Sequence, residues 1–134
     1  VWSDELEVCA MKHAKNCPGG HSDMSCGLAS GYPMGENMHW FPWPPTKAKL
    51  ESQVYDWWKE LYSPGYDWYK ARAVNGIWAS TGHYTIQDGY GVTEVGCGFV
   101  DCSAKGKWST FVCQYRSRPG KRAKAIGDYV ESIY

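Results

Sequence analysis

His83 is the residue most readily connected with chemistry, because an imidazole inside a fold needs a partner. It stands in the run TGHYTIQDGYGVTEVGCG, residues 81–98, among strand-forming residues, and Cys97 follows fourteen residues later. A carboxylate or a second imidazole beside it would give a hydrogen-bonded network, an acid–base pair or ligands for a divalent metal. The candidate partners are His13, His21, Glu36, His39, Glu60 and several other acids, and spacing alone does not choose among them.

Six cysteines indicate the compartment in which the chain folds: Cys9, Cys17, Cys26, Cys97, Cys102 and Cys113. An even number of cysteines in a chain of 134 residues predicts three disulfide bonds and an oxidising environment, so we expect a secreted, extracellular protein. A structural zinc site is not favoured, because no two cysteines form a C-x-x-C pair. No apolar run approaches the ~20 residues of a membrane-spanning helix.

The elements that must position these residues predict an α+β domain. We expect helices over residues 3–17 and 46–62, a loop-rich segment over 18–46, and strands over 82–88, 92–102 and 107–115. Ser3 and Thr46 can cap the two helices. The stretch HWFPWPPT, residues 39–46, is too interrupted by proline to be a central strand. Glu60 falls at the edge of the apolar stripe of the second helix, where a carboxylate can face a cleft.

Charge and aromatic content limit the partners. The formal net charge is zero, so no overall field recruits nucleic acid, and we expect no nucleic-acid partner. Eight Trp and ten Tyr suit either core packing or an exposed groove for a sterol, a fatty acid or a sugar ring. One local run of cations has no acid among its members: Arg116, Arg118, Lys121, Arg122 and Lys124. It is either a solvated tail or a surface for glycosaminoglycan or anionic lipid headgroups.

Five short motifs in a fixed order carry a resemblance to a known family. They are GENM at 35–38, WWKE at 57–60, GHYT at 82–85, EVGCG at 94–98 and FVCQY at 111–115. Together they resemble the CAP superfamily, the cysteine-rich secretory, antigen 5 and pathogenesis-related-1 proteins, in its animal form. The resemblance covers nearly the whole chain.

The resemblance implies a fold and a site. The fold is a three-layer α-β-α sandwich with a three- or four-stranded antiparallel sheet. The site is a cleft tetrad formed by His21, Glu36, Glu60 and His83. Two imidazoles facing two carboxylates make a site for a divalent cation, most naturally zinc. The resemblance also pairs Cys17 with Cys102 and Cys97 with Cys113, which leaves Cys9 and Cys26 as the third pair.

The chain departs from the family at its start. Family members usually open with an additional helix, whereas this sequence begins at Val1. We therefore expect residues 1–134 to form a single CAP domain without that helix. Such a chain should expose apolar surface around Trp2 and Leu6. We expect this surface to be covered by a partner chain, by a bound lipid or by a further N-terminal segment.

The expected function is binding. We expect a secreted, non-enzymatic CAP protein that takes a small apolar ligand such as a lipid or sterol, a receptor or a surface, with a tetrad that holds a divalent cation. A purely structural histidine–carboxylate network is the simpler interpretation of the tetrad. Two further alternatives stay open: a metal-dependent hydrolase that uses the same tetrad, and a glycosaminoglycan or anionic-surface binder that uses the basic run.

Overall fold

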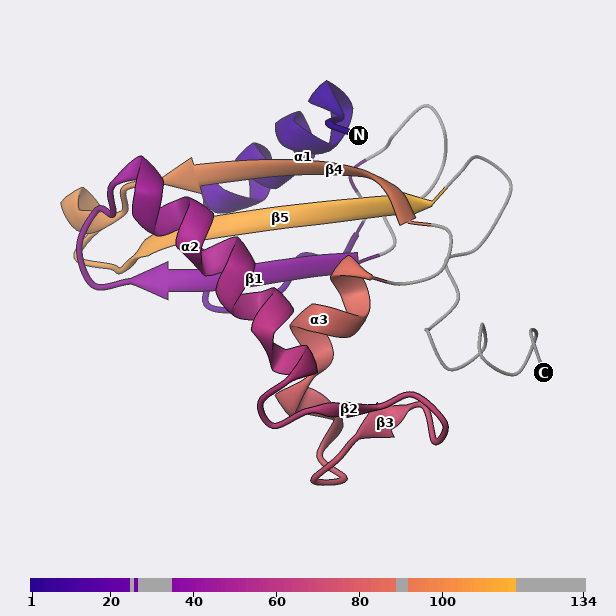
Figure 1. The fold of residues 1–134 in the computed structure, drawn as a ribbon. Coiled ribbons are helices and arrows are strands. Elements are labelled where there is room, and N and C mark those ends of the chain that lie inside the picture. Colours follow the sequence, from indigo (N-terminus) through magenta and orange to yellow (C-terminus); the bar gives the residue numbers. More distant parts are fainter. Residues whose placement is uncertain (25, 27–34, 89–91, 118–134) are drawn as a thin grey trace.

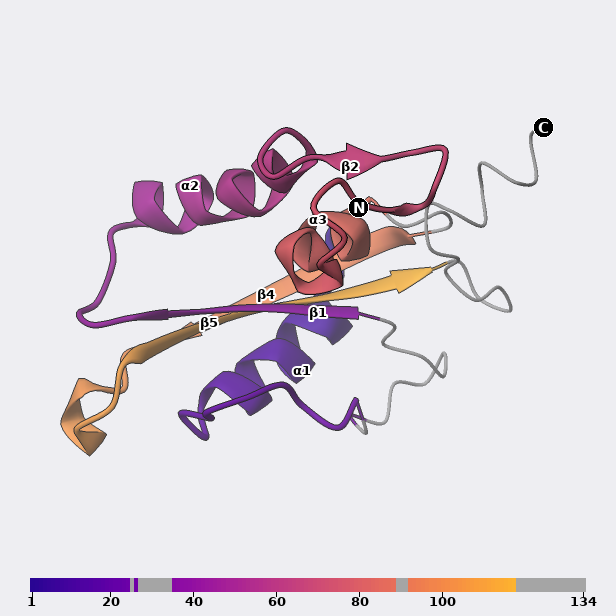
Figure 2. The same ribbon diagram turned by 90° about the horizontal axis from the view of Figure 1, so that it is seen from below.

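The computed structural model describes residues 1–24, 26, 35–88 and 92–117. They form three layers, with a sheet as the middle layer (Figure 1). The sheet contains β1 (Gly35–Phe41), β4 (Val92–Val100) and β5 (Ser109–Ser117), all antiparallel, in the order β1-β5-β4. One face is covered by α1 (Asp4–Ala14), and the other by α2 (Lys47–Trp58) and α3 (Gly82–Gln87), as Figure 2 shows. The α-β-α sandwich expected from the sequence is therefore confirmed.

α1 lies unusually close to the sheet because glycines in β4 leave room for it. A Cβ on Gly98 would stand 2.6 Å from the Cα of Met11, and a Cβ on Gly96 would stand 2.2 Å from the backbone nitrogen of Glu7. The G-x-G pattern in the strand therefore marks a close backbone approach. Leu6 is fully buried in this layer, contrary to the expected exposure, whereas Trp2 is 54% exposed.

The opposite layer is organised around Trp57 of α2. Its indole stacks on Phe111 of β5, with ring centroids 5.6 Å apart, and on His83 of α3, with centroids 5.5 Å apart. The helix begins after Thr46, whose side chain accepts a hydrogen bond from the Lys49 N–H group. The smaller elements are the 3-10 turns η1 (Lys59–Leu61), η2 (Trp78–Ser80) and η3 (Ser103–Lys105), and the hairpin of β2 (Tyr66–Asp67) with β3 (Arg72–Ala73).

Two sequence expectations about local structure are wrong. Residues 82–87 form helix α3 and not a strand, because the Glu60 carboxylate accepts the Tyr84 N–H group near the helix start, at 3.1 Å, and Tyr84 is completely buried. Residues 35–41 form a strand within the segment expected to be mostly loop. β1 is an edge strand that ends at Phe41, directly before the proline, so the exclusion of a central strand agrees with the structure.

Three disulfide bonds tie the layers together: Cys9–Cys26, Cys17–Cys102 and Cys97–Cys113. The last two are the pairs that the family resemblance implies, and Cys9–Cys26 is the pair that remains. Cys97 and Cys113 stand opposite each other on β4 and β5, with Cα atoms 4.0 Å apart. The Cys17–Cys102 bond joins the segment after α1 to the end of β4 and closes a loop with a sequence separation of 85 residues.

Candidate functional site

His83 and Glu60 form the first of two histidine–carboxylate pairs. The Nδ1 atom of His83 lies 2.7 Å from Oε1 of Glu60. The second oxygen of Glu60 accepts the N–H group of Tyr84, so one carboxylate both holds the imidazole and caps α3. The Asn37 amide donates to the His83 carbonyl oxygen at 3.1 Å. His83 is therefore oriented by Glu60 of η1, by Asn37 of β1 and by Trp57 of α2, whose indole stacks on the imidazole.

His21 and Glu36 form the second pair, with Nδ1 of His21 2.9 Å from Oε1 of Glu36. The Glu36 side chain has no exposed surface, whereas the His21 side chain is 58% exposed. Ser22 donates its N–H to Oε1 at 2.8 Å and its hydroxyl to Oε2 at 2.7 Å, and the Gln114 amide donates to Oε2 at 2.8 Å. Each carboxylate oxygen therefore accepts two hydrogen bonds.

These hydrogen bonds keep Glu36 ionised. Burial alone would raise the pKa of its carboxyl, but the bonds from Gln114, Ser22 and His21 outweigh it and lower the pKa below the ordinary value. An ionised carboxylate accepts a hydrogen bond from the Nδ1–H group, so the Nε2 atom of His21 is the ring nitrogen left for another partner. In the other pair, the Nδ1 atom of His83 likewise faces the Glu60 carboxylate and its Nε2 atom does not.

The two pairs lie on opposite faces of the edge strand. Side chains alternate along β1, so Glu36 faces α1 whereas Asn37, which contacts His83, faces α3. Among the described residues, no group of three or more His, Cys, Asp or Glu is placed to hold a metal ion. The structure thus brings His21 to Glu36 and His83 to Glu60, and does not gather all four around one point.

Another histidine lies near the His83–Glu60 pair. His39, on the same face of β1 as Asn37, packs edge-on against Phe41 with ring centroids 4.5 Å apart. Its pKa is lowered, first by burial and then by the charges of Lys49 and His83. His39 is thus a neutral imidazole at neutral pH.

An apolar groove of about 500 Å³ lies between α2, α3 and the β4 side of the sheet. Val54, Tyr55 and Trp58 of α2 form one wall, and the Tyr55 and Trp58 rings stack with centroids 5.7 Å apart. Further lining comes from Trp2, Val95, Tyr115 and the Cys97–Cys113 bond, and the charged side chains on it are Glu51 and Asp88. Sequence reasoning identified the aromatic content but not this groove, because its walls come from segments far apart in the chain.

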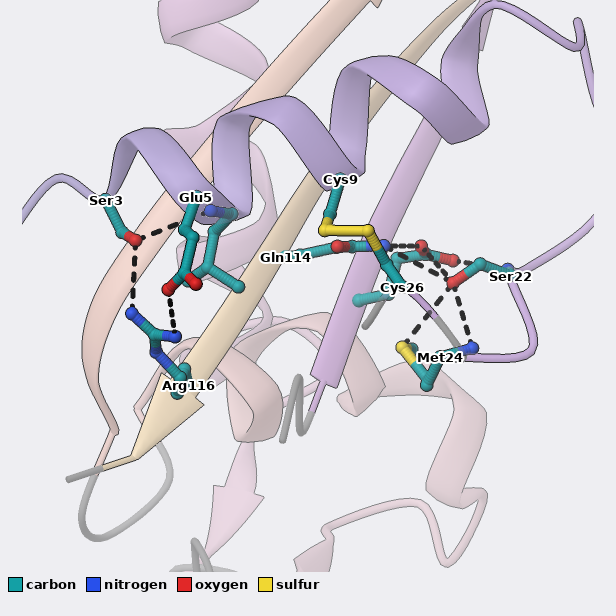
Figure 3. The surroundings of a disulfide bond; sticks show 10 residues. Ser3, Glu5, Cys9, Ser22, Met24, Cys26, Gln114 and Arg116 are labelled. Atoms are coloured by element: carbon teal, nitrogen blue, oxygen red, sulfur yellow. Dashed lines mark hydrogen bonds and ion pairs between the residues drawn. A yellow bond between two sulfur atoms is a disulfide. The ribbon is translucent and has the colours of Figure 1, made fainter. Parts of the chain in front are cut away.

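Arg116, the first residue of the basic run, is not part of an exposed cationic surface. The Arg116 side chain is 10% exposed, and its guanidinium pairs with the carboxylates of Glu5, at 2.7 Å, and Glu94. It also donates to the hydroxyl of Ser3 (Figure 3). Arg116 lies on β5 facing α1, so it is a structural cation. The other members, Arg118, Lys121, Arg122 and Lys124, lie outside the described residues.

Two polar residues missed by the sequence analysis complete the Glu36 pair. Gln114 and Ser22 contact its carboxylate beside the Cys9–Cys26 bond, beneath α1 (Figure 3). The signal for Gln114 is a polar residue inside the apolar strand FVCQY, which is expected to need a buried partner.

Comparison with known proteins gives consistent matches along the chain. The sequence model of the cysteine-rich secretory protein family, CAP, matches residues 1–115. Venom allergen 5 of Vespula vidua is 33% identical over 125 residues, covering 86% of this chain and 54% of the relative. Protein PRY2 of Saccharomyces cerevisiae is 29% identical over 135 residues, covering 99% of this chain and 34% of the relative. The chain thus spans about half or less of these relatives.

Solved structures repeat the fold. The crystal structure of NaASP2 with Zn²⁺ superposes with a TM-score of 0.72 and 27% identity, covering 94% of this chain and 64% of that one. The crystal structure of Na-ASP-1 superposes with a TM-score of 0.71 and 26% identity, covering 94% of this chain and 31% of that one.

Proposed function

The chain belongs to the cysteine-rich secretory protein (CAP) family, and from this premise we propose that it is a secreted protein that acts by binding a small apolar ligand. Three disulfide bonds support the extracellular location, because such bonds persist in oxidising compartments. Within the described segments, no helix is long and apolar enough to cross a membrane.

The apolar groove beside α2 is the observation that carries this proposal. Its volume of about 500 Å³ lies within the ~300–1,000 Å³ of typical small-molecule sites. Among the described residues, the charged side chains of the lining are both acids, Glu51 and Asp88, so a fatty-acid carboxylate would meet like charges at the rim. A neutral ligand meets no such cost. We therefore assign the groove to a neutral amphiphile of the sterol class.

Sterol binding is tested by energy transfer from tryptophan to a fluorescent sterol such as dehydroergosterol. The variant Val54→Gln places an amide in the groove wall and is expected to weaken binding about tenfold, because a buried amide without a partner costs ~1–3 kcal/mol. Val74→Gln, at an exposed position outside the groove lining, is the matched control and should bind as the parent does. Palmitate should compete poorly. Equal loss in both variants would contradict the groove as the site.

A divalent cation, most naturally zinc, is the second component of the proposal. Nδ1 of both His21 and His83 is held by a carboxylate, the usual orientation of a zinc-bound histidine, whose second nitrogen binds a carboxylate. Both imidazoles are partly exposed, and no partner of either Nε2 is found within the described residues. Glu36 and Glu60 would thus orient the imidazoles and not coordinate the ion. Because the two pairs lie on opposite faces of β1, one ion would have to reach both imidazoles around the open edge of that strand. The solved structure of NaASP2 with Zn²⁺ supports this choice.

Zinc binding is tested by melting curves with micromolar zinc and with chelator. The parent protein is expected to gain about 2.7 kcal/mol of stability at a hundredfold excess over Kd. His21→Ala and His83→Ala should each abolish the gain, and His13→Ala, outside both pairs, should keep it. The gain should weaken below about pH 6, because imidazoles must be neutral to coordinate. An unchanged curve in the parent would leave only the structural interpretation of the two pairs.

A further inference from the structure

A second hollow, of about 400 Å³, lies at the end of the sheet away from the histidine–carboxylate pairs. It is lined by Cys17, Pro18, Gly19, Trp40, Lys107 and Trp108. Trp40 stands opposite Thr110 at the start of β5, whereas Glu36 stands opposite Gln114, so four residues separate the two sites along β1. At about 3.3 Å per residue this is roughly 13 Å.

Hydrogen bonds and a disulfide bond within the chain hold the walls of this hollow in place without a ligand. The Trp40 indole N–H donates to the Pro18 carbonyl oxygen at 2.9 Å. The ammonium of Lys107 donates to the Cys17 carbonyl oxygen at 3.2 Å, and the disulfide to Cys102 anchors Cys17 from the other side. Because the walls are already ordered, a ligand would bind with a smaller loss of conformational entropy. Trp108, by contrast, is 59% exposed although it immediately precedes the strand β5.

The chemistry of the lining is aromatic and cationic. Two indoles provide flat apolar surfaces, and the Lys107 ammonium has three donors, one of which is used by the Cys17 carbonyl. Lys105 lies nearby and donates to the Lys15 carbonyl oxygen at 3.0 Å, so three exposed lysines gather at the end of α1. The lining residues that the structure describes include no carboxylate. The acid on the adjoining connection, Asp101, accepts bonds from Ser103 and Ser109.

We propose that this Trp40–Trp108 hollow binds an acidic saccharide, a uronic or sulfated pyranose unit of a glycosaminoglycan. The apolar face of the pyranose ring packs on an indole, and the anionic substituent is bound by Lys107 and its neighbouring lysines. A neutral sugar would offer no anion to the ammonium groups, which donate only to the carbonyl oxygens of Cys17 and Lys15 among the described residues, and the sugar hydroxyls would meet no carboxylate of the described lining. The residues that line this hollow differ from those that line the sterol groove, and none of them belongs to the basic run at 116–124.

Titration with a heparin-derived hexasaccharide, followed by isothermal calorimetry at fixed ionic strength, tests the proposal. Trp108→Ala is expected to weaken binding about tenfold, and Lys107→Gln about fivefold. The matched controls are Trp78→Ala and Lys47→Gln, two exposed positions outside the hollow, and both should bind as the parent does. Melting curves of the four variants establish that each is folded.

Any of three results would overturn the proposal. Equal affinity for a neutral hexasaccharide such as cellohexaose would show that the anionic groups are not recognised. Competition by inorganic sulfate at the concentration of sulfate groups in the hexasaccharide would indicate a simple ion site. Heparin binding that survives both Trp108→Ala and Lys107→Gln would place the contact elsewhere, for example on the basic run.

Discussion

Replacing Glu36 by glutamine is the perturbation that most sharply tests the geometry of the His21–Glu36 pair. Glu36→Gln keeps the shape of the side chain but turns one acceptor oxygen into a donor. An amide at the Oε1 position would face the Ser22 N–H group, which cannot change its role. An amide at the Oε2 position would face the Ser22 hydroxyl, which can rotate, and Gln114, which can flip because its own Oε1 has no partner among the described residues.

The second orientation is therefore preferred, and its cost can be estimated. The two bonds to Oε1, from His21 and Ser22, lose their charge assistance, worth about 1 kcal/mol each, so the loss is about 2 kcal/mol. For a domain of this size that corresponds to a fall in Tm of about 6–10 °C. Thermal unfolding followed by circular dichroism at pH 7 measures it, and Glu51→Gln, with its exposed side chain, is the matched control.

The contribution of Glu36 to the stability of the folded protein should decrease at low pH. The pKa of Glu36 is lowered in the folded state, so its stabilising contribution is fully present above the ordinary value of 4.5 and is lost as pH falls through the folded value. The parent should lose stability in that window, and the difference from Glu36→Gln should shrink. Two results would show that an ionised Glu36 does not stabilise the fold. One is a Tm for Glu36→Gln equal to that of the parent at pH 7, and the other is a Tm difference between the two proteins that is unchanged at pH 2.

Three further predictions follow from the packing. Gly98→Ala should destabilise by about 1–3 kcal/mol, because its methyl group would overlap the α1 backbone, whereas Gly20→Ala, with open space around it, should stay within about 0.5 kcal/mol; urea unfolding distinguishes them. Replacing Cys17 and Cys102 together by Ser should cost about 4–5 kcal/mol by loop entropy, and a double variant as stable as the parent in urea would exclude that bond. Arg116→Met should cost up to about 3 kcal/mol, because its two partner carboxylates lose their cation; a melting curve like that of the parent would show that the ion pairs contribute nothing.

Where local signals are strong, the sequence predicts the structure well. Ser3 caps α1 as expected, and its hydroxyl accepts the Leu6 N–H group at 3.4 Å. The five motifs carry the family resemblance, and that resemblance implies the sandwich that the structure shows. It also implies the four histidine–carboxylate residues, of which Glu36, Glu60 and His83 lie in the motifs and His21 does not, although their arrangement as two pairs is not implied.

Where distant contacts decide, the sequence is insufficient. Residues 82–87 have strand-forming side chains, yet the Glu60 carboxylate from another element caps them as helix α3, and Ile86 packs against Gly35, which has no Cβ to obstruct it. Arg116 belongs to a cationic run, yet its position on β5 turns it toward two carboxylates under α1. Both outcomes depend on partners that the chain supplies from far away.

A crystal structure of the protein grown with a neutral sterol tests the central claim most directly. If the groove binds sterol, electron density for the rings is expected between Trp58 of α2 and Val95 of β4, with the sterol hydroxyl toward the rim that carries Glu51 and Asp88. A sterol bound at another surface, or a groove that stays free of sterol at saturating concentration, would contradict the account.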